Sequence, residues 1–199
     1  MAEETMIPAE NQEPNQNPEG EKGSFKLDLY FWTQALVMAL IFLILVFTLI
    51  GRVIGVVGSS MVPTLHGGDL LILQSIGYTP EQGDVVVLRK SSFMSEPVVK
   101  RVIATQGQHV IVDYASGTVT VDGQTLDEPY INEVMVDPLN PLMTVLDVTV
   151  PEGSIYVMGD NRNHSSDSRD ERLGTVDARY VLGRALFVIV PFQHFGPIQ

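Results

Sequence analysis

The stretch DVVVLRKSSFMSEPVVKRVIA, Asp84–Ala104, contains two short apolar runs, Val85–Leu88 and Val98–Ala104, separated by a more polar segment. Valine and isoleucine are β-branched and favour strands. Runs of the same kind recur along the chain, divided by turn-forming Gly, Asp and Pro, at Leu70–Leu73, His109–Tyr114, Thr118–Val121, Ser154–Met158 and Ala185–Val190. Short strands with regular turns between them predict a mainly β fold.

A long apolar segment precedes these runs. Residues 31–50 carry no charge and are long enough for about one bilayer crossing as a helix. Tyr30, Phe31 and Trp32 stand at its start, where amphipathic rings suit the headgroup layer. A buried core helix would be shorter and keep a polar face, and a cleaved secretory signal would have a basic start and a shorter apolar core. We therefore predict one uncleaved transmembrane anchor over 29–53.

The segment before the anchor, 1–28, is rich in Glu, Asn, Gln and Pro and poor in apolar residues. Such a composition buries too little apolar surface to fold, so we expect a disordered tail. Lys22 and Lys26 flank the anchor on this side and Arg52 on the other, which favours a cytoplasmic N-terminus. The β-rich part would then lie on the extracytoplasmic face of the cell membrane, in contact with lipid through the anchor.

Composition excludes several kinds of function. The formal net charge of −12 argues against nucleic acid as a partner, because phosphate backbones require basic surfaces. The absence of cysteine excludes disulfides, thiolate catalysis and zinc–thiolate sites. Within the β-rich part, the stretch 106–153 has its own hairpin signals and a Pro-rich loop, DPLNPLM. We expect it to form a small cap inserted into a core made of 54–105 and 154–199.

Two hydroxyl residues follow the anchor in the loop GSSMVPTL, Gly58–Leu65. A loop serine is usually an ordinary turn residue, and its hydroxyl becomes a nucleophile only when a base takes its proton. Histidine is the commonest base. The sequence context singles out none of the four histidines, His66, His109, His164 and His194, and each could be a surface or turn residue.

Lys100 is a second candidate base. Strand alternation places Val98, Lys100 and Val102 on one face. A lysine between two valines on an inward face would lose water, and desolvation lowers the pKa of its ammonium group. The alternative is that the side chain extends along the apolar surface and keeps its charge in water.

A dense polar stretch, GDNRNHSSDSRDE, follows the expected strand at 154–158. Its spacing does not match a calcium-binding loop, because Arg162 and Ser165 occupy the third and sixth positions counted from Asp160. It could be a solvated acidic loop. It could also support a site, with Asp167 pairing Arg169 and Ser165 orienting a nearby lysine.

Together these segments resemble bacterial type I signal peptidase, a membrane serine protease family. The resemblance covers about 31–191 and rests on blocks in matching order and spacing: SMVPTL at Ser60–Leu65, GDLL at Gly68–Leu71, GDVVV at Gly83–Val87, KRVI at Lys100–Ile103 and GDNRNHSSDSR at Gly159–Arg169. Any one block would be weak evidence. The full set behind one N-terminal anchor is specific.

The resemblance implies an antiparallel β catalytic core with a small inserted β cap, and cleavage of signal peptides from exported preproteins. Ser60 would be the nucleophile and Lys100 the general base, supported by Ser165, Asp167 and Arg169. Gly58 stands where some relatives carry a serine that completes the oxyanion hole, so only backbone groups could donate there. Candidate walls of shallow pockets for small substrate residues are Val56, Met61, Leu65, Val98 and Val99, any of which could instead be ordinary core. The resemblance implies no metal and no cofactor, and we expect a monomer.

Two other functions fit parts of this pattern. A self-cleaving repressor of related fold also uses a Ser–Lys pair, but such proteins are soluble and carry a DNA-binding domain. A membrane-tethered β domain that only binds a partner would have no need for Ser60, Lys100, Ser165 and Asp167 together.

Overall fold

The computed structural model describes residues 18–50, 52–136 and 145–198. One long helix, α1, spans Pro18–Ile50. Its segment Phe25–Leu45 has a mean hydropathy of 1.9 and is long and apolar enough to cross a membrane. The helix begins before the predicted anchor, so the disorder we expected does not extend over 18–28, and proline is well tolerated in a first helical turn. The rest of the expected tail, 1–17, lies outside the described residues.

The β-rich unit is built around an eight-stranded antiparallel sheet, which confirms the predicted fold class. The strand order is β1-β2-β11-β3-β4-β9-β10, with β12 paired to β11. The strands are β1 (Arg52–Gly55), β2 (Leu70–Gln74), β3 (Val85–Leu88), β4 (Val98–Thr105), β9 (Ser154–Met158), β10 (Val176–Asp177), β11 (Val181–Val190) and β12 (Gly196–Pro197).

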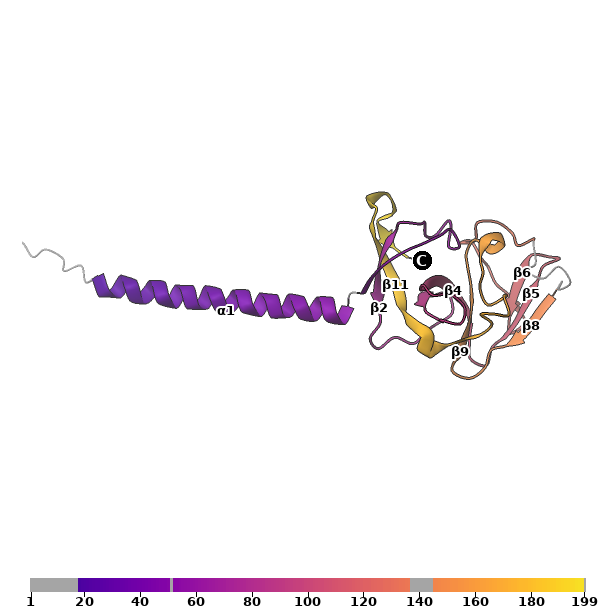
Figure 1. The fold of residues 1–199 in the computed structure, drawn as a ribbon, viewed down its shortest axis with the longest axis horizontal. Coiled ribbons are helices and arrows are strands. Elements are labelled where there is room, and N and C mark those ends of the chain that lie inside the picture. The colour runs from indigo at the N-terminus through magenta and orange to yellow at the C-terminus, as the bar shows by residue number, and fades with distance from the viewer. Residues whose placement is uncertain (1–17, 51, 137–144, 199) are drawn as a thin grey trace, which may run out of the picture. The chain divides into compact units, whose positions relative to one another are not determined.

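A second, four-stranded antiparallel sheet has the order β7-β6-β5-β8. Its strands are β5 (His109–Asp113), β6 (Thr118–Val121), β7 (Gln124–Thr125) and β8 (Val145–Thr149). All four fall inside 106–153, the range in which we expected a cap, while the Pro-rich DPLNPLM segment lies outside the described residues. Figure 1 shows β5, β6 and β8 together at one end of the β-rich unit, with β2 and β11 toward the other.

The first strand corrects the end of the predicted anchor. Arg52 and Val53, which we assigned to the anchor, belong to β1 and pair with Leu73 and Ile72 of β2. An apolar run does not reveal where a helix stops and a strand begins when both are hydrophobic. The loop that follows β1 therefore starts from a strand of the main sheet.

Strand β4 lies inside the main sheet between β3 and β9. Six consecutive residues, from Val99 to Ala104, are buried, because both faces of the strand are covered. The described residues also form short 3₁₀ turns: η1 (Arg162–His164), η2 (Ala178–Tyr180) and η3 (Phe192–His194).

Candidate active site

The loop between β1 and β2 carries Ser60 and is closed at its base by main-chain hydrogen bonds. The Val56 amide donates to the Asp69 carbonyl at 2.8 Å, and the Gly68 amide donates to the Val56 carbonyl at 2.9 Å. Met61 and Leu65 are 1% and 0% exposed and fix the middle of the loop in the core. This arrangement holds Ser60 in a defined place although it lies outside any strand.

Lys100 reaches Ser60 from the centre of β4. Its Nζ donates to Ser60 Oγ at 2.7 Å and to the Val99 carbonyl at 3.0 Å. The side chain is buried, and this desolvation lowers the pKa of Lys100 to about 8, although the nearby Asp167 carboxylate acts in the opposite direction. The amino group of Lys100 therefore lies inside the protein. The alternative, in which the side chain extends along the apolar surface to keep its charge in water, does not hold.

Asp167 and Arg169 form a buried pair in the loop after β9. Arg169 Nε lies 2.7 Å from Asp167 Oδ1, and Arg169 Nη2 lies 2.8 Å from Asp167 Oδ2. The Gly159 amide also donates to Asp167 Oδ2 at 2.9 Å. Burial alone would raise the pKa of Asp167, but the Arg169 charge and these hydrogen bonds hold it below its usual value.

Ser165 lies beside this pair but is not joined to the lysine. Its hydroxyl is buried and lies next to the Asp167 carboxylate, whose pKa it helps to lower. It packs against Gly159, where an added Cβ would come within 2.3 Å of Ser165 Oγ and 2.4 Å of the Ser60 carbonyl oxygen. Glycine is therefore required at position 159, because any side chain would push these two segments apart.

The loop after β9 also holds the Ser60 loop through contacts that sequence reasoning missed. Asn161 donates from its main-chain amide to the Ser60 carbonyl at 3.0 Å and from Nδ2 to the Ser59 carbonyl at 3.0 Å. Asp160 forms a buried ion pair with Arg101 of β4 at 2.7 Å. In the sequence, Asp160 and Asn161 are visible only as polar residues shortly after an apolar strand run. That position does not indicate which residues they contact.

A cleft of about 260 Å³ opens in front of Ser60 and Lys100. Of the residues we predicted there, it is lined by Val56, Gly58, Ser60, Met61, Val98, Val99 and Lys100. Leu65 is not a lining residue and lies in the core. The sequence reasoning did not select Met94, Pro97, His164 and Ser166, which also line the cleft.

Gly58 has a φ of +86°, in the left-handed region that favours glycine. No heavy atom lies within 4 Å of where its Cβ would be, so the backbone conformation is the main constraint at this position. Its place on the cleft lining leaves the main chain accessible there.

Known proteins with similar sequences were found by comparison. The family model described as signal peptidase, peptidase S26, matches residues 29–190. A protein named probable signal peptidase I-1 from Synechocystis is 36% identical over 149 residues, which is 70% of this chain and 71% of that protein. Signal peptidase I from Bacillus licheniformis is 33% identical over 175 residues, 84% and 92% of the two chains.

A crystal structure of a signal peptidase I from Enterococcus faecalis aligns with a TM-score of 0.44 and 28% identity. The alignment covers 54% of this chain and 97% of that one. The family model and the two sequence relatives establish, independently of this structural match, that the chain belongs to the signal peptidase family, peptidase S26.

Proposed function

We propose that this chain is a membrane-anchored serine endopeptidase that cleaves N-terminal signal peptides from exported preproteins with a Ser60–Lys100 dyad. The observation that carries the proposal is the 2.7 Å separation of Lys100 Nζ and Ser60 Oγ. The pair lies on a cleft, and the lysine has a pKa lowered to about 8 by burial. A buried base next to a loop hydroxyl is the arrangement that nucleophilic catalysis requires.

The chemistry follows from these two groups. Neutral Lys100 takes the Ser60 proton as Oγ attacks the scissile carbonyl carbon, and the carbonyl oxygen becomes an oxyanion. The Ser60 amide and the accessible main chain at Gly58 would stabilise that charge. Lys100 then passes the proton to the departing amine, which leaves an acyl-enzyme. A water molecule, deprotonated by Lys100, hydrolyses the ester and restores Ser60.

The resemblance to type I signal peptidase implies substrates with small residues, typically alanine, one and three positions before the cut. The cleft of about 260 Å³ next to Ser60 and Lys100 is the place where these residues would bind. Val56, Met61, Val98 and Val99 supply apolar walls for them.

The supporting residues act through the lysine and the loops. The paired charges of Asp167 and Arg169 hold the segment next to Lys100 without adding a net charge to its surroundings. Ser165 has a buried hydroxyl in the same segment, next to Asp167, and we assign it the role of orienting Lys100 during the reaction. Leu65 supports the loop from the core rather than contacting substrate.

The anchor brings the enzyme to its substrate. We place α1 across the cell membrane in contact with lipid, with the N-terminus in the cytoplasm and the β-rich unit, as a monomer, outside. In the sequence, Ser60 follows the last helical residue, Ile50, by only ten positions. A short connection suits a preprotein whose signal helix is itself held in the bilayer.

Cleavage of a labelled preprotein by the full chain in detergent micelles tests the proposal. The variants are Ser60→Ala and Lys100→Met, with Ser91→Ala and Lys90→Met as matched controls at positions that do not line the cleft. We expect wild type and controls to cut after an Ala-x-Ala site, and both dyad variants to fold but lose at least about a thousandfold in rate. Cleavage that persists in Ser60→Ala would sink the assignment. A folded but inert wild type would favour a tethered binding domain.

A further inference from the structure

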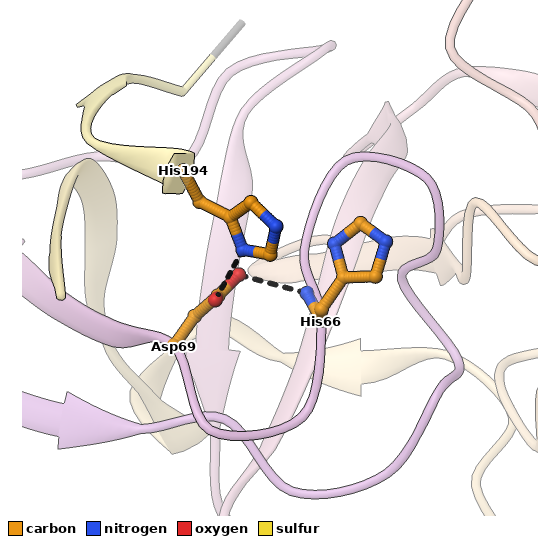
Figure 2. Close-up of side chains that lie close together, drawn as sticks. All are labelled: His66, Asp69 and His194. Carbon is orange, nitrogen blue, oxygen red and sulfur yellow. Dashed lines mark hydrogen bonds and ion pairs between the residues drawn. The ribbon is translucent and has the colours of Figure 1, made fainter. Parts of the chain in front are cut away.

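His66, Asp69 and His194 come together in the folded chain (Figure 2). His66 and Asp69 belong to the loop between β1 and β2, and His194 ends the 3₁₀ turn η3 after β11. The two histidines lie far apart in the sequence, so only the fold brings them together. Neither histidine lines the cleft.

Asp69 is held firmly at the base of this cluster. It is 1% exposed, and its Oδ2 accepts a hydrogen bond from the His66 amide at 2.8 Å. Its Oδ1 lies 2.8 Å from His194 Nδ1. The carboxylate is therefore buried and fixed in orientation, and its second oxygen faces the imidazole of the C-terminal segment.

Both imidazole rings remain accessible above the carboxylate. The His194 side chain is 39% exposed, and the ring centroids of His66 and His194 lie 4.6 Å apart at an angle of 31°. Figure 2 shows the two rings side by side next to Asp69. One ligand atom from each residue lies within 4.8 Å of the others.

We propose that His66, Asp69 and His194 bind one divalent first-row transition-metal cation, with Zn²⁺ the best match. Two imidazoles and one carboxylate are a common donor set for such ions, and water would complete a tetrahedral shell. Ligand atoms of one tetrahedral Zn²⁺ lie about 3.4 Å apart, which follows from bond lengths of about 2.0–2.1 Å. The partly exposed rings can turn to close the remaining gap, while buried Asp69 stays in place.

A simple histidine–carboxylate pair would look different, and the chain provides one for comparison. His109 lies 2.6 Å from Asp147, with side chains 41% and 65% exposed. That carboxylate is not buried, and His109 and Asp147 belong to no such group of three ligands among the described residues. Within the part of the chain that the structure describes, only the cluster at Asp69 combines a buried carboxylate with a second imidazole in reach.

Metal binding here would join the C-terminal segment to the loop that carries Ser60. The ion would bridge η3 and the loop, and because it binds only the folded arrangement it would stabilise that arrangement. The ion takes no part in the proposed cleavage chemistry, in which Lys100 is the base. The inference therefore does not depend on the proposed peptidase activity.

The test uses the full chain in detergent micelles, purified with a tag that contains no histidine and freed of metal by a chelator. Titration with Zn²⁺ in a calorimeter should give about one bound ion per chain. His66→Gln and His194→Gln should each weaken affinity by at least about tenfold, because each removes one ligand. His109→Gln should bind as wild type does. Added Zn²⁺ should raise the Tm of wild type and His109→Gln but not of the other two variants.

Substitution of Co²⁺ in wild type adds a readout that requires no variant. A four-coordinate site with nitrogen and oxygen ligands should give intense visible absorption, and its absence overturns the proposed coordination. A wild type that takes up no ion at micromolar Zn²⁺ also overturns the proposal. So does equal loss of affinity in His109→Gln, or full affinity in the His66→Gln and His194→Gln double variant.

Discussion

In the proposed mechanism, the pH dependence of cleavage is set by Lys100. Only its neutral form can accept the Ser60 proton, and its pKa is lowered by burial to about 8. Below that pH we expect kcat/KM to fall about tenfold for each pH unit, and above it to level off. Rates on a soluble peptide between about pH 6 and 10 measure the profile. Lys90→Met should show the same midpoint, while a midpoint near that of an ordinary lysine would contradict the buried base.

The same lowered pKa predicts a cost in stability. The folded protein binds the Lys100 proton more weakly than the unfolded chain does, because burial lowers the pKa from 10.5 to about 8. The mismatch opposes folding by roughly 3 kcal/mol below about pH 8 and disappears as the pH rises toward about 10.5. Lys100→Met removes it but also removes the hydrogen bonds to Ser60 and to the Val99 carbonyl, so the free energy of unfolding at pH 7 should rise by only about 1–2 kcal/mol.

Unfolding of wild type and Lys100→Met in the same micelles at several pH values checks this prediction. The advantage of the variant should shrink as the pH increases from about 8 to about 10.5. Lys90→Met serves as the control and should show no comparable gain. If Lys100→Met is less stable than wild type at pH 7, the free-energy cost of burying the Lys100 ammonium is offset by other interactions of the lysine.

At the scale of elements, the segment after β7 is fastened to η1 by a buried ion pair. Arg162 Nη1 lies 2.9 Å from Glu128 Oε2, and the two side chains are 1% and 6% exposed. Removing one partner of such a pair leaves a buried charge and costs about 3–5 kcal/mol. We expect Glu128→Gln to lower the free energy of unfolding by about that amount, as measured by denaturant unfolding.

The exposed acid of the His109 pair provides the control for this prediction. Asp147→Asn should change stability by less than about 1 kcal/mol, because exposed ion pairs contribute little. Combining Glu128→Gln with Arg162→Met should recover part of the loss, since the unpaired charge is then gone. If the double variant loses as much free energy of unfolding as the two single variants together, the two residues act separately.

The composition of each strand decides whether the sequence alone could predict it. The seven apolar runs all form strands, because β-branched residues with turn signals between them indicate strands locally. Strands β7, β10 and β12 have two residues each and exist only through pairing with a neighbour. Strand β1 was hidden by the apolar helix that precedes it. Order and register in the sheets depend on contacts between distant segments, which composition does not encode.

The candidate site was predictable to a similar degree. Residue type and local context made Ser60 and Lys100 candidates only, and the resemblance to type I signal peptidase singled them out. The structure places their side chains 2.7 Å apart. The interactions of Asn161 with the Ser60 loop were not visible, because a polar loop has no periodicity. His66 and His194 also looked ordinary, since their common partner Asp69 becomes apparent only in the folded chain.

At the scale of the whole molecule, one apolar helix precedes a β-rich unit, and the orientation of that helix decides which compartment the unit enters. Signal peptides are removed from proteins that have been exported, so the proposed function requires the β-rich unit to face outward. Lys22 and Lys26 before the apolar segment outnumber Arg52 directly after it, which favours retention of the N-terminus in the cytoplasm.

The absence of cysteine makes this orientation directly measurable. Ala2→Cys and Ala115→Cys each introduce a single thiol, one before the helix and one at an exposed turn between β5 and β6. In sealed right-side-out membrane vesicles, a membrane-impermeant maleimide should label Ala115→Cys at once and Ala2→Cys only after detergent is added. Unsubstituted protein should take up no label. The reverse pattern would place the β-rich unit in the cytoplasm, and labelling of both thiols without detergent would mean that the helix does not span the bilayer. Either result would separate the Ser60–Lys100 dyad from exported preproteins and leave the proposed substrate class without support.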